Sequence, residues 1–583
     1  MIANTWTRPR ELFAYRPGRA TGGLVFRVGY ADETLPTSGT TALVVALALR
    51  AVERPGLDVA ASVGPAVTEV RVSGSDDRVR TTLRELARAL ADLPVRHRET
   101  EARSLRERAV DAAPPLPPWR FGLRGYGLGP GQYVGLHRTT DDDLRAWASE
   151  RFAGSNAVAW FTGETAQDLN LALPDAVPAT RVLPAPLVEG LALSLPADAP
   201  VGGTNVRWDA LVPDVPALAV LSEVARRALF QNLRHDRGWT YDVSASIGVL
   251  DGEQAAWQIA AGLRRETAAE ATGEFLDTWG RLRYAVADDE LETARAHLLV
   301  AFDEPHQDAI WLADDAVRTL LGRPSQVPAE RRAAIAGVTA ADVVALARQA
   351  WGSGLLVTPV GSGWAGTSLV SRGASEPVLG RSFERVDVDA TIVVGDTGVT
   401  LRDGRTRVTV RFDAAAALLA YPDGGRLLVG LDGARVPFEP TLHDDLDARD
   451  VAELVDRNLP TELVIPVPRQ EVPERPDKDQ SQRAQQARAE REVEEDGLAQ
   501  TVGAMAGAVG RLGLIIVLVL GLLAGVGGAI LCVATLMAWV AAWGDEPWQV
   551  PALVVPAGLA AAGVTWLCYR AILRLGDEVE KNG

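Results

Sequence analysis

Cysteine and histidine are scarce in this 583-residue sequence, and their scarcity excludes several kinds of site. The two cysteines, Cys532 and Cys568, both lie in long apolar stretches near the C-terminus. The rest of the chain therefore has neither a disulfide framework nor a cysteine-based metal site. No two of the six histidines stand at a metal-ligand spacing such as i and i+4, so the histidines do not predict a metal centre either.

Basic residues are also in the minority. The chain has 59 lysines and arginines against 76 acidic residues, and its formal net charge of −17 argues against binding to nucleic acid. The N-terminus lacks the apolar core of a secretory signal, so the bulk of the chain is predicted to stay on the side where it is made. No nucleophile elbow, phosphate-binding loop or catalytic cysteine is visible, and no cofactor is predicted. A hydrophobic content of 47% with 23% charged residues is nevertheless typical of a folded chain.

Strand-like and helix-like segments alternate at the start of the chain. Residues 23–30 and 67–73 are predicted to be strands, and residues 40–52 are apolar enough for a buried helix. Ser75 is predicted to cap a second helix, whose apolar residues recur at helical spacing. This alternation predicts an α/β or α+β layered domain.

Two distant segments of the sequence repeat the same pattern. A helix that opens with Thr140-x-x-Asp143 is followed by a glycine-containing turn and a strand, and the helix that opens with Thr339-x-x-Asp342 is followed by the same pair. Thr-x-x-Asp resembles a capping box, in which each side chain bonds to the free backbone donor of the other residue. Two similar closing units predict a duplicated domain.

The stretch 233–241 lies at the centre of the functional argument. An apolar helical face runs up to Leu233, a turn follows at 236–238, and residues 241–247 alternate as a strand would. In its residue types and their order, this stretch resembles the signature in the second half of the insulinase/pitrilysin-type zinc metallopeptidases. In that family an arginine and a tyrosine seven positions apart hold the substrate backbone, and Arg234 and Tyr241 have this separation. The alternative is an ordinary helix–turn–strand, whose arginine is a surface charge or caps its own helix.

The resemblance covers roughly residues 20–362 and implies two α+β halves in one unit. The first half of the family carries His-x-x-Glu-His, in which the histidines bind zinc and the glutamate is the general base. Here Ala42 and Ala46 stand at the histidine positions and Val45 at the base position. Glu107 is the remaining candidate for the family's acidic ligand. Because an aliphatic group can neither ligate zinc nor accept a proton, the resemblance implies that the zinc site has been lost.

A different pattern begins near residue 386. Short strand-like runs are separated by Asp403-Gly404, Asp423-Gly424 and Asp432-Gly433, which are strong hairpin signals. A helix is predicted at 446–458 after these runs. The order of a β-meander and one closing helix resembles a pleckstrin-homology-like barrel.

The C-terminal part is predicted to cross a membrane twice. Residues 512–543 and 550–569 are uncharged over most of their length, and each run reaches the roughly 20 residues that a bilayer requires. Arginines flank the outer ends of the pair, and an acidic loop lies between the two runs. This charge pattern predicts that both termini and the folded domains are cytoplasmic.

The sequence therefore predicts an α+β chain: a duplicated two-half insulinase-like unit, a small β-barrel-like (pleckstrin-homology-like) domain and two transmembrane helices. The predicted segments are half 1 (1–185), half 2 (186–363), a linker (364–380), the β domain (381–468), a charged spacer (469–508) and the transmembrane hairpin (510–575).

The leading functional hypothesis is a membrane-anchored, catalytically inactive peptidase homologue. Its expected partners are polypeptide, the lipid bilayer and a zinc-bearing homologous subunit, with Arg234 and Tyr241 as the substrate-binding residues. One alternative is an active membrane-bound metallopeptidase whose site is not recognised, and another is a membrane scaffold with no peptide site.

Overall fold

The computed structural model describes residues 6–477 and Gln486, with gaps at 7, 53–55, 111–116, 130–132, 177–189, 202, 251–252, 304–306, 360–362, 405, 470 and 476. The predicted transmembrane hairpin at 510–575 and most of the predicted spacer at 469–508 lie outside the described residues. All the elements below belong to the first of two units of the chain, Met1–Ala484.

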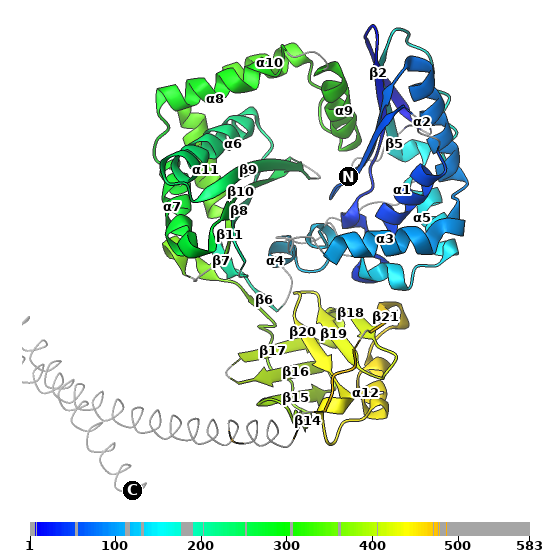
Figure 1. Cartoon of the computed structure of the whole chain (residues 1–583), viewed down its shortest axis with the longest axis vertical. Coiled ribbons are helices and arrows are strands. Elements are labelled where there is room, and N and C mark those ends of the chain that lie inside the picture. Colours follow the sequence, from blue (N-terminus) through cyan, green and yellow to red (C-terminus); the bar gives the residue numbers. More distant parts are fainter. Residues whose placement is uncertain are drawn as a thin grey trace, which may run out of the picture. The chain divides into compact units, whose positions relative to one another are not determined.

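The first sheet has five strands in the order β1-β5-β2-β4-β3. Its strands β2 and β5 are labelled in Figure 1. Strand β1 runs parallel to β5, whereas every other pair is antiparallel. The strands are β1 (Arg10–Tyr15), β2 (Ala20–Phe26), β3 (Asp58–Val63), β4 (Thr68–Gly74) and β5 (Ala157–Gly163).

Helices cover one face of this sheet. The apolar stripe of α2, which includes Val79 and Leu83, packs in one core with Val70 and Val72 of β4. Helix α1 is buried beside α2, α3 and α5, and these contacts place the start of α1 in the interior of the first half. The helices are α1 (Thr40–Arg50), α2 (Asp76–Ala91), α3 (Arg98–Val110), α4 (Pro117–Phe121) and α5 (Asp141–Arg151).

The second sheet repeats the first. Its order is β12-β7-β11-β8-β10-β9. Apart from the added strand β12, β7 lies parallel to β11, and β11, β8, β10 and β9 are antiparallel neighbours in that order. The first sheet has the same arrangement, with β1 parallel to β5 and then β2, β4 and β3. The strands are β7 (Ala197–Pro200), β8 (Asn205–Pro213), β9 (Thr240–Val249), β10 (Gln254–Leu263), β11 (Leu355–Thr358) and β12 (Ser368–Leu369). This agreement of order and direction is what a duplicated domain requires.

Four tryptophans form the centre of the second core. The rings of Trp208 and Trp351 stack with their centroids 4.5 Å apart, and those of Trp257 and Trp279 lie 4.8 Å apart. They join the sheet to helices α6 (Pro216–Leu229), α7 (Ala268–Arg281), α8 (Asp288–Val300), α10 (Pro328–Ala336) and α11 (Ala340–Gly352).

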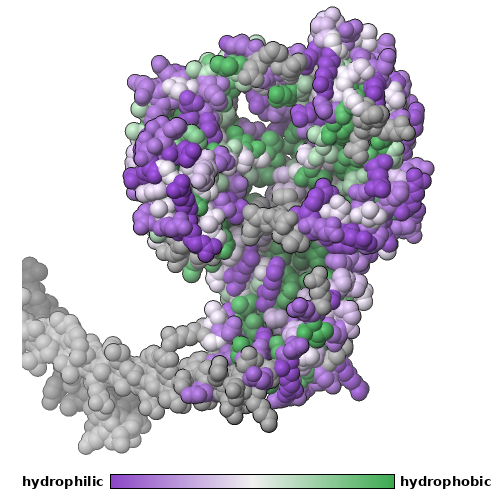
Figure 2. Space-filling view, in the orientation of Figure 1, coloured by the Kyte–Doolittle hydropathy of each residue, from purple (hydrophilic) through white to green (hydrophobic). Residues whose placement is uncertain are grey.

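Helix α9 (Gln307–Leu320) comes from the second half of the sequence but packs on the first sheet. Ala309, Ala316 and Leu320 join a core with Val25 and Trp160, on the face that α1 and α2 leave open. A helix from the second half therefore covers this face of the first sheet. In the view of Figure 2, hydrophilic residues dominate the outer surface of this part of the chain.

The repeated closing units form as predicted. Asp143 N donates to Thr140 Oγ1 over 3.2 Å and Thr140 N donates to Asp143 Oδ2 over 2.9 Å. Thr339 and Asp342 form the same pair of bonds at the start of α11. The prediction for Ser75 was only half right. Ser75 precedes α2 with extended backbone, but its side chain makes no capping hydrogen bond. The negative charges of Asp76 and Asp77 in the first turn favour the N-terminus of the helix instead.

The third part of the unit consists of two four-stranded sheets, β14-β15-β16-β17 and β20-β19-β18-β21. All three predicted Asp-Gly turns connect antiparallel neighbours, and Gly404, Gly424 and Gly433 adopt positive φ. The elements are β14 (Arg381–Glu384), β15 (Ala390–Gly395), β16 (Gly398–Asp403), β17 (Thr406–Arg411), β18 (Ala415–Ala420), β19 (Arg426–Gly430), β20 (Arg435–Phe438), α12 (Ala448–Leu454) and β21 (Val464–Pro466).

Two features differ from the predicted barrel and linker. Among the described residues no strand pairing joins the two sheets into a closed barrel, and β21 follows the helix that was expected to close the domain. The predicted linker is partly strand: β12 pairs with β7, and β13 (Ser371–Arg372) pairs with β6 (Leu191–Ala192). The pleckstrin-homology-like assignment remains a prediction.

The described residues also provide a limited test for membrane spans. No single described helix combines the length and hydropathy needed to cross a membrane. One pair, α10 and α11, passes that test only when joined, and it is bent by 92° at the break.

Candidate functional site

The candidate site is built on the helix between the second and third strands of the second sheet. Helix α6 ends at Leu229 and continues as a π-helix, η7 (Phe230–Asp236), so the single α-helix predicted up to Leu233 changes its hydrogen-bond pattern in its last turns. Leu229 and Leu233 are both fully buried and anchor this segment to the core. Short π-helical segments occur often at functional sites.

A tight reversal follows η7 and sets the position of Tyr241. Gly238 N donates to Arg234 O over 3.2 Å and Trp239 N donates to Leu233 O over 2.8 Å. Gly238 has φ of +66°, a conformation that a residue with a side chain rarely adopts. The chain then enters β9, which begins one residue before Tyr241.

The reversal brings Arg234 and Tyr241 together. The Arg234 guanidinium carbon lies 5.2 Å from the centre of the Tyr241 ring, which is within the range of a cation–π contact. Tyr241 is 72% exposed, although it is a large aromatic residue in a strand. The structure thus places the two predicted substrate-binding residues side by side on an open surface.

Arg264 is a third member of this group, and the sequence alone did not reveal it. Arg264 directly follows β10. Its guanidinium carbon lies 5.6 Å from the ring centre of Tyr241, and its Nη2 donates to the tyrosine hydroxyl over 3.5 Å. The backbone of Arg264 is fixed because its N–H donates to Trp239 O. Among the described residues, neither Arg234 nor Arg264 forms an ion pair with a carboxylate. We call Arg234, Tyr241 and Arg264 the Arg/Tyr cluster.

Side-chain bonds hold the helix end beneath the Arg/Tyr cluster. Asn232 donates to Glu274 over 2.6 Å and to Thr278 over 2.8 Å, both on α7. Arg237 donates to Asn232 and pairs with Glu274 at 2.7 Å. Asn232 and Arg237 therefore fix the segment, while Arg234 is left available. The alternative in which Arg234 caps its own helix is not favoured, because its guanidinium bonds to no helix carbonyl in the described part of the chain.

Helix α1 is the counterpart of α6 and η7 in the first half, since it too connects the second and third strands. Ala42 and Ala46 lie one turn apart and are half-buried, and Val45 is buried. Glu107 lies on α3 and is exposed. No group of three or more histidine, cysteine, aspartate or glutamate side chains in the described residues could hold a metal ion.

A buried carboxylate, Glu33, lies at the start of α1. It is 5% exposed, and it accepts from Gly39 N over 2.8 Å and Thr41 N over 2.7 Å. Burial raises the pKa of Glu33 to about 7, although these two bonds act in the opposite direction. One feature of the sequence points to such a carboxylate. Gly39, the N-cap residue of α1, has no side chain that could accept from the free N–H groups of the helix, so another residue must accept from them.

Comparison with known proteins gives a family match for part of the second half and a fold likeness for the larger part of the chain. Residues 197–298 match the family described as the peptidase M16 inactive domain. The structure resembles that of a peptidase M16 inactive domain from Pseudomonas fluorescens, with a TM-score of 0.51 and 14% identity over 62% of this chain and 99% of the other. It also resembles a protease from Helicobacter pylori, with a TM-score of 0.51 and 15% identity over 61% of this chain and 98% of the other. No curated protein matches the sequence significantly.

These findings show the fold of the chain and the family that one segment of its second half matches. The chain contains an inactive M16-like peptidase homologue domain within a mixed α+β fold. The insulinase-type resemblance of the sequence is supported to that extent. An inactive domain of this type is consistent with a pseudopeptidase.

Proposed function

We propose that this protein is a catalytically inactive insulinase-type peptidase homologue that holds a segment of polypeptide at the Arg/Tyr cluster. The observation that carries the proposal is the exposed Tyr241 ring between two arginines that lack carboxylate partners among the described residues. Arginine donors and a tyrosine hydroxyl can both donate to a peptide carbonyl oxygen. The alkyl side chains of Ala42, Val45 and Ala46 supply neither a ligand nor a base.

The proposal extends to a partner and a location. The protein either binds the peptide alone or contributes the cluster to a zinc-bearing homologous subunit, whose reaction it would assist by stabilising the developing oxyanion. The long apolar runs at 512–543 and 550–569 support a two-span membrane anchor with the folded domains in the cytoplasm.

Peptide binding tests the first part of the proposal. A fluorescein-labelled 20-residue peptide without defined structure is titrated with the full-length protein and with Arg234→Ala and Tyr241→Phe variants, and its anisotropy is recorded. Arg234→Ala is expected to weaken binding by roughly tenfold, the value of one hydrogen bond to a charged group, and Tyr241→Phe by roughly threefold to tenfold, the value of a neutral hydrogen bond.

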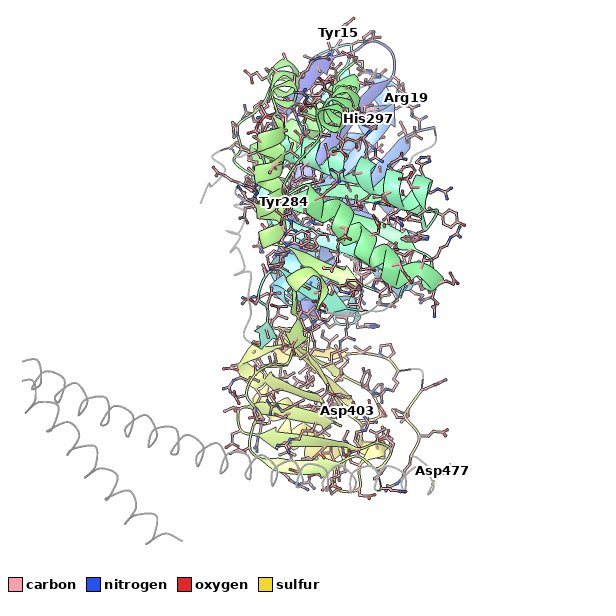
Figure 3. All side chains as sticks on the ribbon, turned by 90° about the vertical axis from the view of Figure 1, so that its left-hand side faces the viewer. Tyr15, Arg19, Tyr284, His297, Asp403 and Asp477 are labelled. Atoms are coloured by element: carbon pink, nitrogen blue, oxygen red, sulfur yellow. The ribbon has the colours of Figure 1, made fainter. Side chains whose placement is uncertain are left out.

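Tyr284 provides a matched control. It is 71% exposed, and the Arg283 guanidinium carbon lies 5.2 Å from its ring, so it reproduces the exposure and cation–π geometry of Tyr241 elsewhere on the fold (labelled in Figure 3). Tyr284→Phe should leave peptide binding unchanged. Equal affinities for the Tyr241 and Tyr284 variants would leave only a scaffold function.

The partner is tested separately, by co-expression with a homologue that carries His-x-x-Glu-His. If the two chains co-purify and the cluster donates to the oxyanion, Tyr241→Phe should slow the partner's peptide cleavage by roughly 10²-fold. Unchanged cleavage by a co-purified pair would remove the catalytic role and leave peptide binding by this chain as the function.

A further inference from the structure

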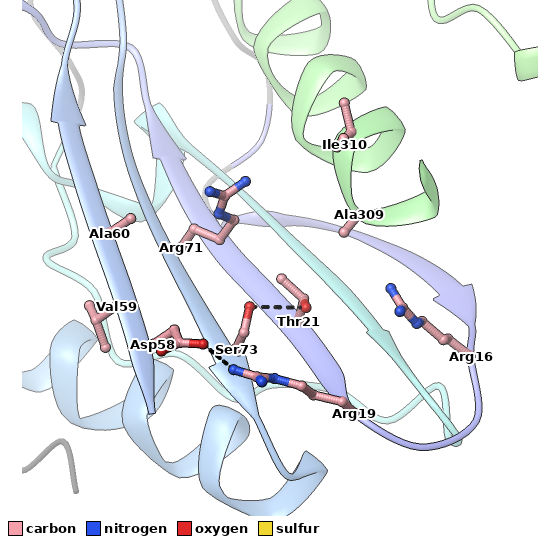
Figure 4. Close-up of a pocket in the computed structure, with 10 residues that line it drawn as sticks. All are labelled: Arg16, Arg19, Thr21, Asp58, Val59, Ala60, Arg71, Ser73, Ala309 and Ile310. Carbon is pink, nitrogen blue, oxygen red and sulfur yellow. Dashed lines mark hydrogen bonds and ion pairs between the residues drawn. The ribbon is translucent and has the colours of Figure 1, made fainter. Parts of the chain in front are cut away.

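A basic cavity lies on the first sheet, apart from the Arg/Tyr cluster. Its volume is about 430 Å³. Val70 and Val72 of β4 point to the helices, so the alternate residues Arg71 and Ser73 point to the opposite face, where the cavity is located. The turn that connects β1 and β2 forms one side of the cavity, and the start of α9 forms another (Figure 4).

Three arginines surround this cavity. Arg71 comes from β4, while Arg16 and Arg19 come from the turn between β1 and β2 (Figure 4). Arg19 forms an ion pair with Asp58 of β3. Among the described residues, Arg16 and Arg71 form no ion pair, although Glu69 lies on the same face of β4. Two carboxylates lie near these arginines: Asp58 is paired with Arg19, and burial raises the pKa of Glu69 by more than the charge of Arg71 lowers it.

Two hydroxyl groups lie between the arginines. Thr21 Oγ1 and Ser73 Oγ are 3.1 Å apart, and either can be the donor of the bond that joins them. A ligand oxygen can therefore receive a neutral hydrogen bond from this pair beside the charged bonds from arginine. Figure 4 shows the three arginine side chains arranged around the pair.

The remaining wall of the cavity is small and apolar. Ala60 of β3 lies on one side, and Ala309 and Ile310 at the start of α9 lie on the other. Ile310 is 52% exposed. The cavity therefore combines a charged part for an anion with an apolar surface beside it.

We propose that this cavity binds the phosphate group of a soluble phosphorylated small molecule. The forked donors of arginine match phosphate oxygens in pairs, and two arginines without partners balance the double charge of a phosphate better than the single charge of a carboxylate. A concave site of this size suits a small ligand. The proposal is independent of the peptide-binding function, because its residues come from the first half and from α9.

Isothermal titration calorimetry with inorganic pyrophosphate tests the proposal on the full-length protein. The Arg16→Ala/Arg71→Ala variant should bind about 100-fold more weakly than the native protein, since each arginine contributes about tenfold. Acetate at the same ionic strength should show much weaker binding to the native protein. The native protein binding acetate and pyrophosphate equally well would contradict the proposal.

Arg78→Ala/Arg88→Ala is the matched control. Both arginines are exposed on α2, on the opposite face of the same sheet, so the net charge changes equally while the cavity is untouched. This variant should bind pyrophosphate as the native protein does. An equal loss in the two double variants would show a general charge effect and overturn the proposed site.

A gain of affinity provides a second test that misfolding cannot imitate. Asp58→Asn removes the carboxylate that pairs with Arg19 and frees a third guanidinium. We expect pyrophosphate to bind about 3- to 10-fold more tightly, because a repulsive charge is removed and a donor is released. Unchanged or weaker binding by this variant would contradict the proposal.

Discussion

Glu33 should make the stability of the first half depend on pH in a range where few other carboxylates titrate. It is 5% exposed at the N-terminus of α1, and burial raises its pKa to about 7 from the ordinary value of 4.5. Between these values the folded protein keeps the proton that the unfolded chain has released. The contribution of Glu33 to stability is therefore fully present below about pH 4.5 and is lost as the pH rises through about 7.

The size of the effect follows from the two pKa values. A difference from 4.5 to about 7 corresponds to about 3 kcal/mol between the protonated and ionised forms, of which about 2.5 kcal/mol should appear between pH 5 and pH 8. The hydrogen bonds from Gly39 and Thr41 end on different oxygens of the carboxyl group, so protonation weakens one of them and leaves the other on a carbonyl oxygen. The backbone at the start of α1 should therefore stay in place while the charge changes.

Urea unfolding at pH 5 and pH 8, followed by tryptophan fluorescence, compares the native protein with Glu33→Gln. The amide cannot ionise, so the difference in unfolding free energy between the two proteins should change by about 2.5 kcal/mol over this range. Lowered histidine pKa values, such as that of His443, act on both proteins alike and cancel in the comparison. Parallel pH profiles for the two proteins would refute the reasoning.

Two further predictions concern the buried pair between the halves and the metal content. Arg120 of α4 donates to the Asp209 carboxylate over 2.8 Å and to the carbonyl oxygens of Asp209 and Ser353. Arg120→Ala should therefore lower the free energy of unfolding in urea by about 3–5 kcal/mol, because it leaves the buried charge of Asp209 unpaired. A loss below about 1 kcal/mol would argue that the pair is not formed in solution. Because alkyl groups occupy positions 42, 45 and 46, elemental analysis should find no stoichiometric zinc, and about one tightly held zinc per chain would sink that expectation.

Elements with a local signal in the sequence were predictable. The Thr-x-x-Asp helices at Thr140 and Thr339 and the turn at Gly424 depend on residues that are close in sequence, and the structure confirms them. Strands β1 and β3 were not predicted. Each lies at an edge of the first sheet, where the alternation of apolar and polar residues is weak, and each is fixed by pairing with a distant partner.

The candidate site was partly predictable for the same reason. Arg234 and Tyr241 could be named because their spacing is local, whereas Arg264 reaches the tyrosine only through the pairing of β9 with β10. The role of α9 was equally hidden, since a helix from the second half covers the first sheet. The burial of Glu33 depends on a loop that folds back onto α1, and no periodic pattern records that contact.

The two connections between the second and third strands differ in the side chains that they present. In the first half this connection is α1, whose Ala42, Val45 and Ala46 contribute packing and no chemistry. In the second half it ends in a π-helix and a glycine turn that present Tyr241 to solvent beside Arg234. Packing does not account for this arrangement, because an aromatic ring left 72% exposed contributes little hydrophobic stabilisation. An exposed cluster held by a rigid helix end is better explained by a ligand that covers it than by the stability of the fold.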